Sequence, residues 1–204
     1  MAQDLSVVGE QKIISLPAKE AVLLKDVWKD QKTLVVFFRR WGCMLCRLWA
    51  KEISEISPVL KSNGVRIVGV GVEEAGHQEF INGKFFDGEL FYVQDRSTYQ
   101  QLGFKRFNMI TILASLLWKQ SRDAISKGNS MGLGGDTKGD KVQVGGALLI
   151  DQDGKLLRNF IQTGPADHLP NEEILKHFGL ESEYKAATMA NQETDRVCTI
   201  DAKA

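Results

Sequence analysis

The chain has 204 residues, and its 26 basic and 26 acidic side chains give a formal net charge of zero. This balance excludes the strongly basic surface expected of a nucleic-acid-binding protein, and no segment approaches the roughly 18 uninterrupted apolar residues that span a bilayer. The start of the chain, Met1–Asp4, is polar and contains an acid, and no basic and apolar signal sequence follows it. We therefore expect a cytosolic protein without stable membrane insertion.

The first half of the chain predicts strands that alternate with helices. A hairpin-like stretch over 13–24, interrupted at Pro17, precedes the apolar run 33–38, whose β-branched and aromatic residues are typical of a strand buried on both faces. A second central strand is expected over 65–72, after the helix stop at Asn63-Gly64.

A long helix is expected between these two strands, from Cys43 to Ser62. Its apolar residues recur at helical spacing and form one stripe that can pack on a sheet. They are Leu45, Trp49, Ile53, Ile56 and Leu60. Pro58, near the end, is expected to kink or shorten the helix.

The second half predicts shorter elements and a closing hairpin. The expected elements are a helix over 73–82, a strand over 90–93, a helix over 97–102, an apolar and then amphipathic stretch over 107–127, a glycine-rich loop over 128–139, strands over 145–150 and 156–162, and a helix over 170–178. The Asp153-Gly154 turn between the last two strands is a strong hairpin signal. Pro170 and Gly179 fit the first turn and the C-terminal cap of the last helix.

Strand–helix alternation followed by a hairpin predicts an α/β protein with a mixed central sheet flanked by helices. The order of the elements is that of the thioredoxin-like fold, with insertions near 73–128. We expect one domain over 1–185 and a flexible C-terminal tail over 186–204, where the sequence becomes small and polar.

Two cysteines, Cys43 and Cys46, stand where the buried strand gives way to the long helix. A thiol at a helix N-terminus faces unpaired backbone N–H groups and the positive end of the helix dipole, and both stabilise a thiolate. Three neighbouring arginines, Arg39, Arg40 and Arg47, could lower the pKa of Cys43 further. Because Cys46 lies one helical turn later, it could attack a species formed on Cys43 and close a disulfide. We predict that Cys43 is the catalytic nucleophile and that Cys46 resolves it.

Other interpretations of the cysteines remain open. The pair could be two unreactive helix residues, or part of a metal site. A zinc site needs four ligands, however, and neither Cys198 in the tail nor the histidines show a matching spacing, so we expect no metal. The histidines, which we expect to be surface or core residues, are His77, His168 and His177.

Two further segments have ambiguous roles. The glycine-rich loop over 128–139 lacks a phosphate-binding pattern, so we expect no bound nucleotide cofactor. The apolar segment over 107–118 could be core, a dimer face, or a groove for an apolar substrate.

Five strings in the chain resemble the peroxiredoxin-like 2 family. They are FRRWGCMLCR, VRIVGVGVEEAGHQEF, FFDGELF, YQQLGFKRFN and GDKVQVGGALLIDQDGKLL. The likeness runs from about residue 5 to about residue 180, and its most specific parts are the paired cysteines and the LGFKRFN segment.

The resemblance implies a thiol-dependent reductase. The implied reaction is reduction of the endoperoxide of prostaglandin H2, or of its ethanolamide, to the F-type diol, with Cys43 and Cys46 at the family's two cysteine positions. Electrons would come from NADPH through thioredoxin reductase and thioredoxin, with no tightly bound cofactor.

Two departures from related families limit this expectation. Peroxiredoxins place a proline and a threonine or serine ahead of the reactive cysteine, where this chain has Val36 and Arg40. Thioredoxins place a cis-proline before the penultimate strand, where this chain has Val144-Gly145-Gly146. Two alternatives therefore stay open: an antioxidant thiol peroxidase for lipid or small hydroperoxides, and a non-catalytic redox-sensing or scaffolding module.

Overall fold

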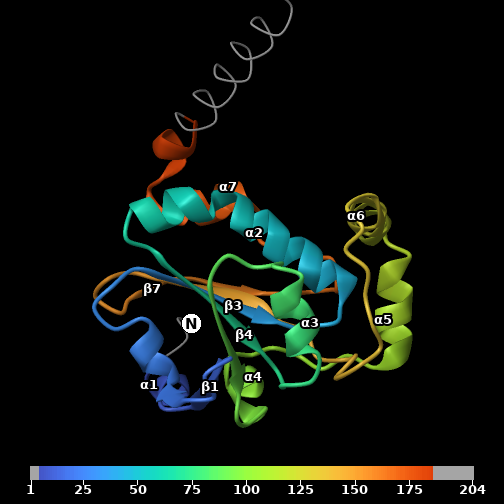
Figure 1. The fold of residues 1–204 in the computed structure, drawn as a ribbon, viewed down its shortest axis with the longest axis horizontal. Helices are drawn as coiled ribbons and strands as arrows, with labels where there is room; N and C mark the ends of the chain where they lie inside the picture. Colours follow the sequence, from blue (N-terminus) through green and yellow to red (C-terminus); the bar gives the residue numbers. More distant parts are fainter. Residues whose placement is uncertain (1–4, 186–204) are drawn as a thin grey trace, which may run out of the picture.

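The computed structural model describes residues 5–185 and has a mixed sheet of seven strands in the order β2-β1-β5-β4-β3-β6-β7 (Figure 1). The strands are β1 (Lys12–Leu16), β2 (Ala21–Leu23), β3 (Thr33–Phe38), β4 (Arg66–Gly71), β5 (Glu89–Val93), β6 (Gly146–Ile150) and β7 (Leu156–Ile161). The helices are α1 (Leu5–Gly9), the 3-10 helix η1 (Leu24–Val27), α2 (Met44–Ser62), α3 (His77–Asn82), α4 (Ser97–Gln101), α5 (Met109–Leu116), α6 (Lys119–Ser130) and α7 (Asn171–Phe178). The predicted tail over 186–204 lies outside the described residues.

The centre of the sheet is the β3–α2–β4 unit. Strand β3 runs parallel to β4 and antiparallel to β6, and β6 continues into the β6–β7 hairpin. The prediction of an α/β, thioredoxin-like fold with a mixed sheet is confirmed. The chain leaves β3 at the edge where α2 begins, so the residues between them are held at the end of the central strand.

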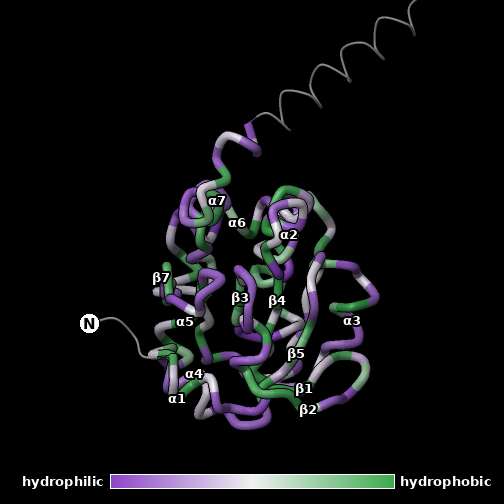
Figure 2. The backbone as a smooth tube through the Cα atoms, turned by 90° about the vertical axis from the view of Figure 1, so that its left-hand side faces the viewer, coloured by the Kyte–Doolittle hydropathy of each residue, from purple (hydrophilic) through white to green (hydrophobic). Residues whose placement is uncertain are grey.

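All six residues of β3 are buried, because helices cover both faces of the sheet (Figure 2). Leu34, Val36 and Phe38 face the core beneath α2 and α7. Val35 and Phe37 face the second core, beside α1 and α4. A strand buried on both faces needs the continuous apolar run that the sequence contains.

The predicted stripe of α2 is buried along its whole length. The helix continues through Pro58 to Ser62, so the expected shortening is wrong. Ile56 and Leu60 are buried on either side of the proline. The burial of these two side chains outweighs the cost of the backbone hydrogen bond that Pro58 cannot donate. The helix therefore continues through the proline, although an isolated helix would be interrupted there.

Other boundaries differ because tertiary contacts outweigh local pattern. Helix α3 begins at His77 and not at Glu73, since the Glu73 carbonyl accepts a hydrogen bond from Trp41 and its carboxylate binds Arg96. Helix α6 runs to Ser130, which makes the first residues of the predicted glycine-rich loop helical. Helix α1 was not predicted. No helix within residues 5–185 is long and apolar enough to cross a membrane.

Candidate active site

The two cysteines occupy the first turn of α2. Cys43 caps the helix in an extended conformation (φ −82°, ψ 120°), and Cys46 lies within it. Both thiols are free. Cys43 is 9% exposed and Cys46 is 2% exposed. Cys43 is thus the more accessible of the two thiols, and the roles of Cys43 as nucleophile and Cys46 as resolving residue stay a prediction.

The two thiols perturb each other in opposite directions. The Cys46 thiol hydrogen-bonds to Cys43 and is the main cause that lowers the pKa of Cys43 well below its ordinary value; the charge of Arg39 lowers it further, and burial opposes both. The same hydrogen bond, together with burial, raises the pKa of Cys46 well above its ordinary value. The pair is therefore set up as one thiolate beside one protonated thiol.

Arg39 is the cation that faces the reactive sulfur. Its Nη1 lies 3.6 Å from Cys43 Sγ, and the side chain is buried. Two backbone carbonyls fix the guanidinium, because Nε donates to the Gln143 oxygen at 3.0 Å and Nη2 donates to the Lys141 oxygen at 3.2 Å. These two hydrogen bonds hold the positive charge of Arg39 beside Cys43 and away from solvent.

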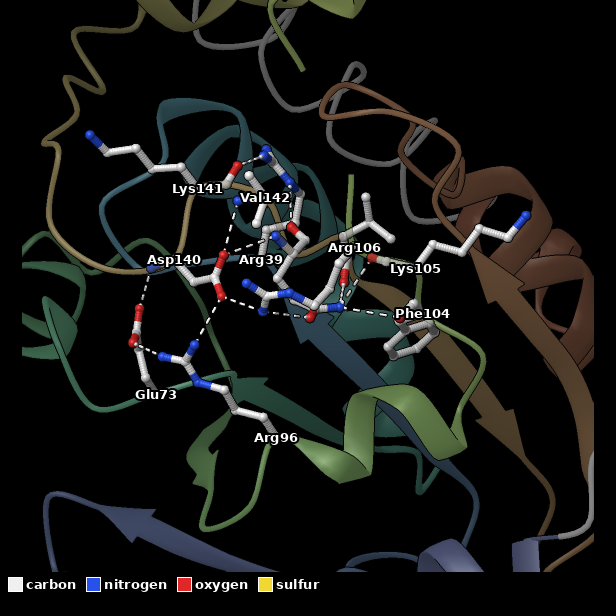
Figure 3. Close-up of polar contacts among 11 residues, drawn as sticks. Arg39, Glu73, Arg96, Phe104, Lys105, Arg106, Asp140, Lys141 and Val142 are labelled. Carbon is white, nitrogen blue, oxygen red and sulfur yellow. Dashed lines mark hydrogen bonds and ion pairs between the residues drawn. The ribbon is translucent and has the colours of Figure 1, made fainter. Parts of the chain in front are cut away.

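The loop that supplies these carbonyls is organised by Asp140 (Figure 3). Asp140 Oδ1 accepts from the backbone N–H groups of Val142 at 2.9 Å and Gln143 at 3.1 Å. Its Oδ2 pairs with Arg96 at 3.0 Å and with Arg106 at 2.5 Å. Burial opposes ionisation of Asp140, but these amides and Arg106 outweigh it and lower the pKa of the carboxyl group.

Glu73 extends the same network toward the sheet. Its carboxylate accepts from the backbone N–H of Asp140 and pairs with Arg96 at 2.6 Å. A continuous chain of contacts therefore runs from Glu73 through Asp140 and the 141–143 carbonyls to Arg39 and Cys43. Spacing in the sequence could not reveal this chain, because Glu73 and Asp140 are 67 residues apart and Arg39 and Gln143 are 104 residues apart.

Arg40 and Arg47 hold a second loop over the site. Arg40 Nη1 pairs with Asp136 Oδ1 at 3.2 Å, and Arg47 Nη2 lies 3.7 Å from Asp136 Oδ2. Arg47 also donates to the backbone oxygens of Trp41 and Leu133. A Cβ atom at Gly42 would lie 2.0 Å from Asp136 Oδ1, so the loop closes on Gly42 only because it has no side chain. Of the three arginines, only Arg39 contacts Cys43, while Arg40 contributes its charge from farther away.

Tyr99 is buried in the second core and contacts the two central strands close to the start of the site, a position that the sequence did not indicate. Its hydroxyl donates to the backbone oxygens of Phe38 and Val70, at the ends of the two central parallel strands. Burial raises its pKa well above the ordinary value, and the negative charge that Cys46 can carry adds to the rise. A tyrosine in a polar segment before LGFKRFN carries no signal of such a position.

The histidines lie in other contacts. His168 Nδ1 is 3.1 Å from Glu52 Oε2, and its ring stacks on Trp49. His77 Nδ1 is hydrogen-bonded to the Glu74 backbone oxygen. Within residues 5–185, no group of three or more histidine, cysteine or acidic side chains could hold a metal ion, and Cys198 lies outside that range.

The apolar segment over 107–118 is divided between core and surface. Ile112 is buried and Leu116 packs on the core, whereas Ile110 and Leu117 are exposed. Two cavities of about 620 Å³ lie elsewhere, one lined by residues that include Phe86 and the other by residues that include His168, and neither includes the two cysteines.

Comparison with known proteins places this chain in a family. The family model described as AhpC/TSA antioxidant enzyme matches residues 52–164. Prostamide/prostaglandin F synthase of Xenopus tropicalis is 37% identical over 197 residues, which cover 96% of this chain and 98% of that protein. The human protein of the same name is 39% identical over 185 residues, covering 90% and 93%.

Solved structures agree in fold. Peroxiredoxin Q of Xanthomonas campestris superposes with a TM-score of 0.56 at 11% identity, covering 90% of this chain and 97% of that one. A peroxidoxin of Mycobacterium tuberculosis gives a TM-score of 0.54 at 14% identity, covering 86% and 96%. The chain belongs to the AhpC/TSA, peroxiredoxin-like family of thioredoxin-fold oxidoreductases. Within that family it is a relative of the vertebrate prostamide/prostaglandin F synthases.

Proposed function

We propose that this protein reduces a lipid endoperoxide, of the kind found in prostaglandin H2 and its ethanolamide, to the F-type diol through Cys43 and Cys46. The observation that carries the proposal is the likeness to proteins named prostamide/prostaglandin F synthase over nearly the whole chain. The perturbed dithiol at the start of α2 supplies a chemistry that suits this reaction.

The first step is attack by the Cys43 thiolate on one oxygen of the endoperoxide. A sulfur–oxygen bond forms and the weak oxygen–oxygen bond breaks, which leaves the second oxygen as an alkoxide. The alkoxide takes a proton and becomes the first hydroxyl of the diol. The neighbouring Cys46 thiol, whose pKa is raised, is protonated at the start and is a nearby donor of that proton.

The second step releases the product. The Cys46 thiolate left by the first step attacks the Cys43 sulfur, the sulfur–oxygen bond breaks, and the departing oxygen takes a proton from water to become the second hydroxyl. Two thiols are oxidised to one disulfide while the endoperoxide gains two electrons and two protons. Because the two side chains already hydrogen-bond to each other, this step needs no large movement of α2.

The cycle then requires a dithiol reductant. We propose thioredoxin, which would be reduced by NADPH through thioredoxin reductase, and we place the reaction in the cytosol, where such a reducing system operates. A bound nicotinamide is unnecessary in this scheme, since the electrons enter by thiol–disulfide exchange.

The first experiment measures NADPH oxidation with thioredoxin and its reductase. Prostaglandin H2, hydrogen peroxide and a lipid hydroperoxide are offered separately, and the product is identified by mass spectrometry. Turnover of the endoperoxide to the F-type diol supports the proposal. Turnover of the hydroperoxides alone contradicts it.

Separate substitution of the cysteines distinguishes their roles. We expect Cys43→Ser to lower turnover by about a thousandfold or more, because the attacking thiolate is gone. Cys46→Ser should also stop turnover, but it should leave an adduct on Cys43 that intact-protein mass spectrometry detects. Full activity of Cys43→Ser would contradict the mechanism.

A thiol peroxidase is the second candidate. The match to the AhpC/TSA antioxidant model and the fold shared with peroxiredoxin Q favour it. The residues at the peroxiredoxin threonine and proline positions argue against it. Arg40, at the threonine position, is bound to the Asp136 carboxylate and the Lys138 backbone oxygen, and Val36, at the proline position, is buried in β3. Slow or single turnover with every peroxide, while Cys43 stays reactive toward alkylating reagents, would instead favour the redox sensor.

A further inference from the structure

Helix α5 carries an exposed apolar face. Ile110 and Leu117 are 78% and 74% exposed, and Met109 and Leu113 are also exposed. At about 100° per residue these four side chains fall within one arc of the helix surface, opposite Ser115 and Ile112, which face the protein. Single exposed leucines are ordinary, but a contiguous group of this kind on a monomer indicates a binding surface.

Trp118 extends this face at the junction with α6. It is 50% exposed, whereas the other three tryptophans, Trp28, Trp41 and Trp49, are buried. One edge of its ring packs near Gly164, so the indole is held in place at the surface. Tryptophan in such a half-exposed position is typical of the boundary between hydrocarbon and water in a bilayer.

The segment that forms the face is rich in basic residues. From 96 to 122 the chain has five basic residues and no carboxylate, and Asp95 and Asp123 bound this stretch. Arg96 and Arg106 are paired with Asp140, and Lys119 lies 3.9 Å from Asp123 in an exposed ion pair. Lys105 and Arg122 are exposed as well. The net charge of zero conceals this local excess.

The face is connected through α6 to the helix that carries the dithiol. Figure 1 shows α5 at the right-hand margin next to α6, which it contacts. Helix α6 packs on α2, and its Gly128 approaches Met44 so closely that a Cβ atom would lie 3.0 Å from the Met44 side chain.

We propose that this α5 surface, formed by Met109, Ile110, Leu113, Leu117 and Trp118 with Lys105, Lys119 and Arg122, binds the surface of an anionic lipid bilayer. An eight-residue helix is about 12 Å long and cannot span the bilayer, but it can lie in the interface with its apolar side chains inserted. Apolar insertion and attraction to anionic headgroups reinforce each other, as peripheral binding requires. A second copy of the chain fits less well, because a symmetric contact would bring the three cations of each copy together.

Vesicle binding tests this proposal directly, without a substrate. Reduced wild-type protein is mixed with phosphatidylcholine vesicles, with and without phosphatidylserine, and bound protein is separated by sedimentation. We expect saturable binding to the anionic vesicles, weak binding to the neutral ones, and release by salt. Trp118 gives a second readout, because brominated lipids should quench it while the three buried tryptophans stay unquenched.

Double variants separate the apolar and the electrostatic contributions to vesicle binding. Ile110→Gln with Leu117→Gln should lower affinity for anionic vesicles by about tenfold or more. Lys105→Gln with Lys119→Gln should lower it by about fivefold per charge and should leave the weak binding to neutral vesicles unchanged. Val7→Gln and Lys29→Gln, at exposed positions elsewhere, are the matched controls and should bind as wild type does.

Other occupants of the surface give different results. The proposal is overturned if folded wild-type protein, with its Cys43 alkylation rate intact, does not bind anionic vesicles, or if the α5 variants bind as tightly as the controls. A dimer that dissociates in Ile110→Gln/Leu117→Gln, without vesicle binding by wild type, would assign the face to a second copy. Loss of thioredoxin binding in that variant, again without vesicle binding, would assign it to a protein partner.

Discussion

At the residue scale, the central feature is that two chemically identical thiols are made different. Cys43 has a lowered pKa because Cys46 hydrogen-bonds to it and Arg39 faces it, and Cys46 has a raised pKa for the reciprocal reason. A thiolate and a protonated thiol side by side suit attack followed by resolution. The helix N-terminus supports this arrangement, but Arg39 is the contact that a single substitution can remove.

Arg39→Gln should raise the pKa of Cys43. In wild type, Cys43 is a thiolate above its lowered pKa, so its alkylation rate should fall only as the pH drops through that value, below the ordinary cysteine pKa of about 8.5. The variant should move this fall to higher pH by about one pKa unit or more, since a hydrogen bond to a charged group is worth about 1.5–3 kcal/mol. Iodoacetamide kinetics across pH measure this shift. Arg122→Gln is the control, and an unchanged profile in Arg39→Gln would contradict the role of this arginine.

At the element scale, two loops decide what surrounds the N-terminus of α2. The loop over 131–138 closes on Gly42 and is held by Arg40 and Arg47 through Asp136. The loop over 140–144 offers its carbonyls to Arg39. Neither loop belongs to a helix or a strand, so side-chain contacts add to a few backbone hydrogen bonds, such as those at the Arg106–Gln143 bridge, in fixing them.

Asp140 should act as a positioning residue for this second loop. Asp140→Ala removes the acceptor for the Val142 and Gln143 amides and leaves Arg96 and Arg106 without a shared carboxylate, so we expect a loss of about 2 kcal/mol in the free energy of unfolding. Alkylation of Cys43 should also slow, because Arg39 loses its fixed carbonyls. Asp140→Asn keeps one acceptor oxygen, so it should retain part of the stability and part of the Cys43 alkylation rate. A loss of stability with an unchanged Cys43 pH profile would mean that Asp140 does not act through Arg39.

The sign of the pH dependence follows from the lowered pKa of Asp140. Its contribution to stability is fully present above the ordinary carboxyl pKa of about 3.9 and is lost as the pH falls through the lower folded-state value. Urea unfolding of wild type and Asp140→Asn should therefore differ most near neutral pH and converge in strong acid. A difference that persists at the lowest pH would contradict this linkage.

At the scale of the whole molecule, one sheet joins two cores. Ile53 belongs to the core beneath α2 and α7, and Val68 belongs to the core beside α1 and α4. Both cores share the side chains of the same central strands, which alternate between them. We propose that this sharing makes residues 5–185 unfold as one unit.

Substitutions in the two cores should shift one common transition. Ile53→Ala should cost about 3 kcal/mol and Val68→Ala about 2 kcal/mol, because each leaves a cavity in a fully buried site. Tryptophan fluorescence and far-ultraviolet circular dichroism should report the same urea midpoint in each variant. Separate midpoints for the two probes, with only one of them moved by each substitution, would show two independently folding units.

Local sequence patterns predicted the α/β fold, the two central strands, the stripe of α2 and the position of the cysteine pair at the start of that helix. These features depend on local periodicity and on neighbours a few residues apart, and the sequence displays both. The family resemblance was also visible in the order of short strings. The continuation of α2 through Pro58 could not be predicted from local sequence, because packing on both sides of the proline outweighs the cost of placing proline inside a helix.

Long-range contacts in the folded chain determine which arginine faces Cys43, that Asp140 fixes the loop behind Arg39, and that Tyr99 joins the ends of β3 and β4. They also divide the 107–118 segment into a buried side and an exposed apolar face. The physical reason is the same in each case. Long side chains and loop carbonyls can choose among many partners, and the choice depends on residues that the fold brings together from distant parts of the chain.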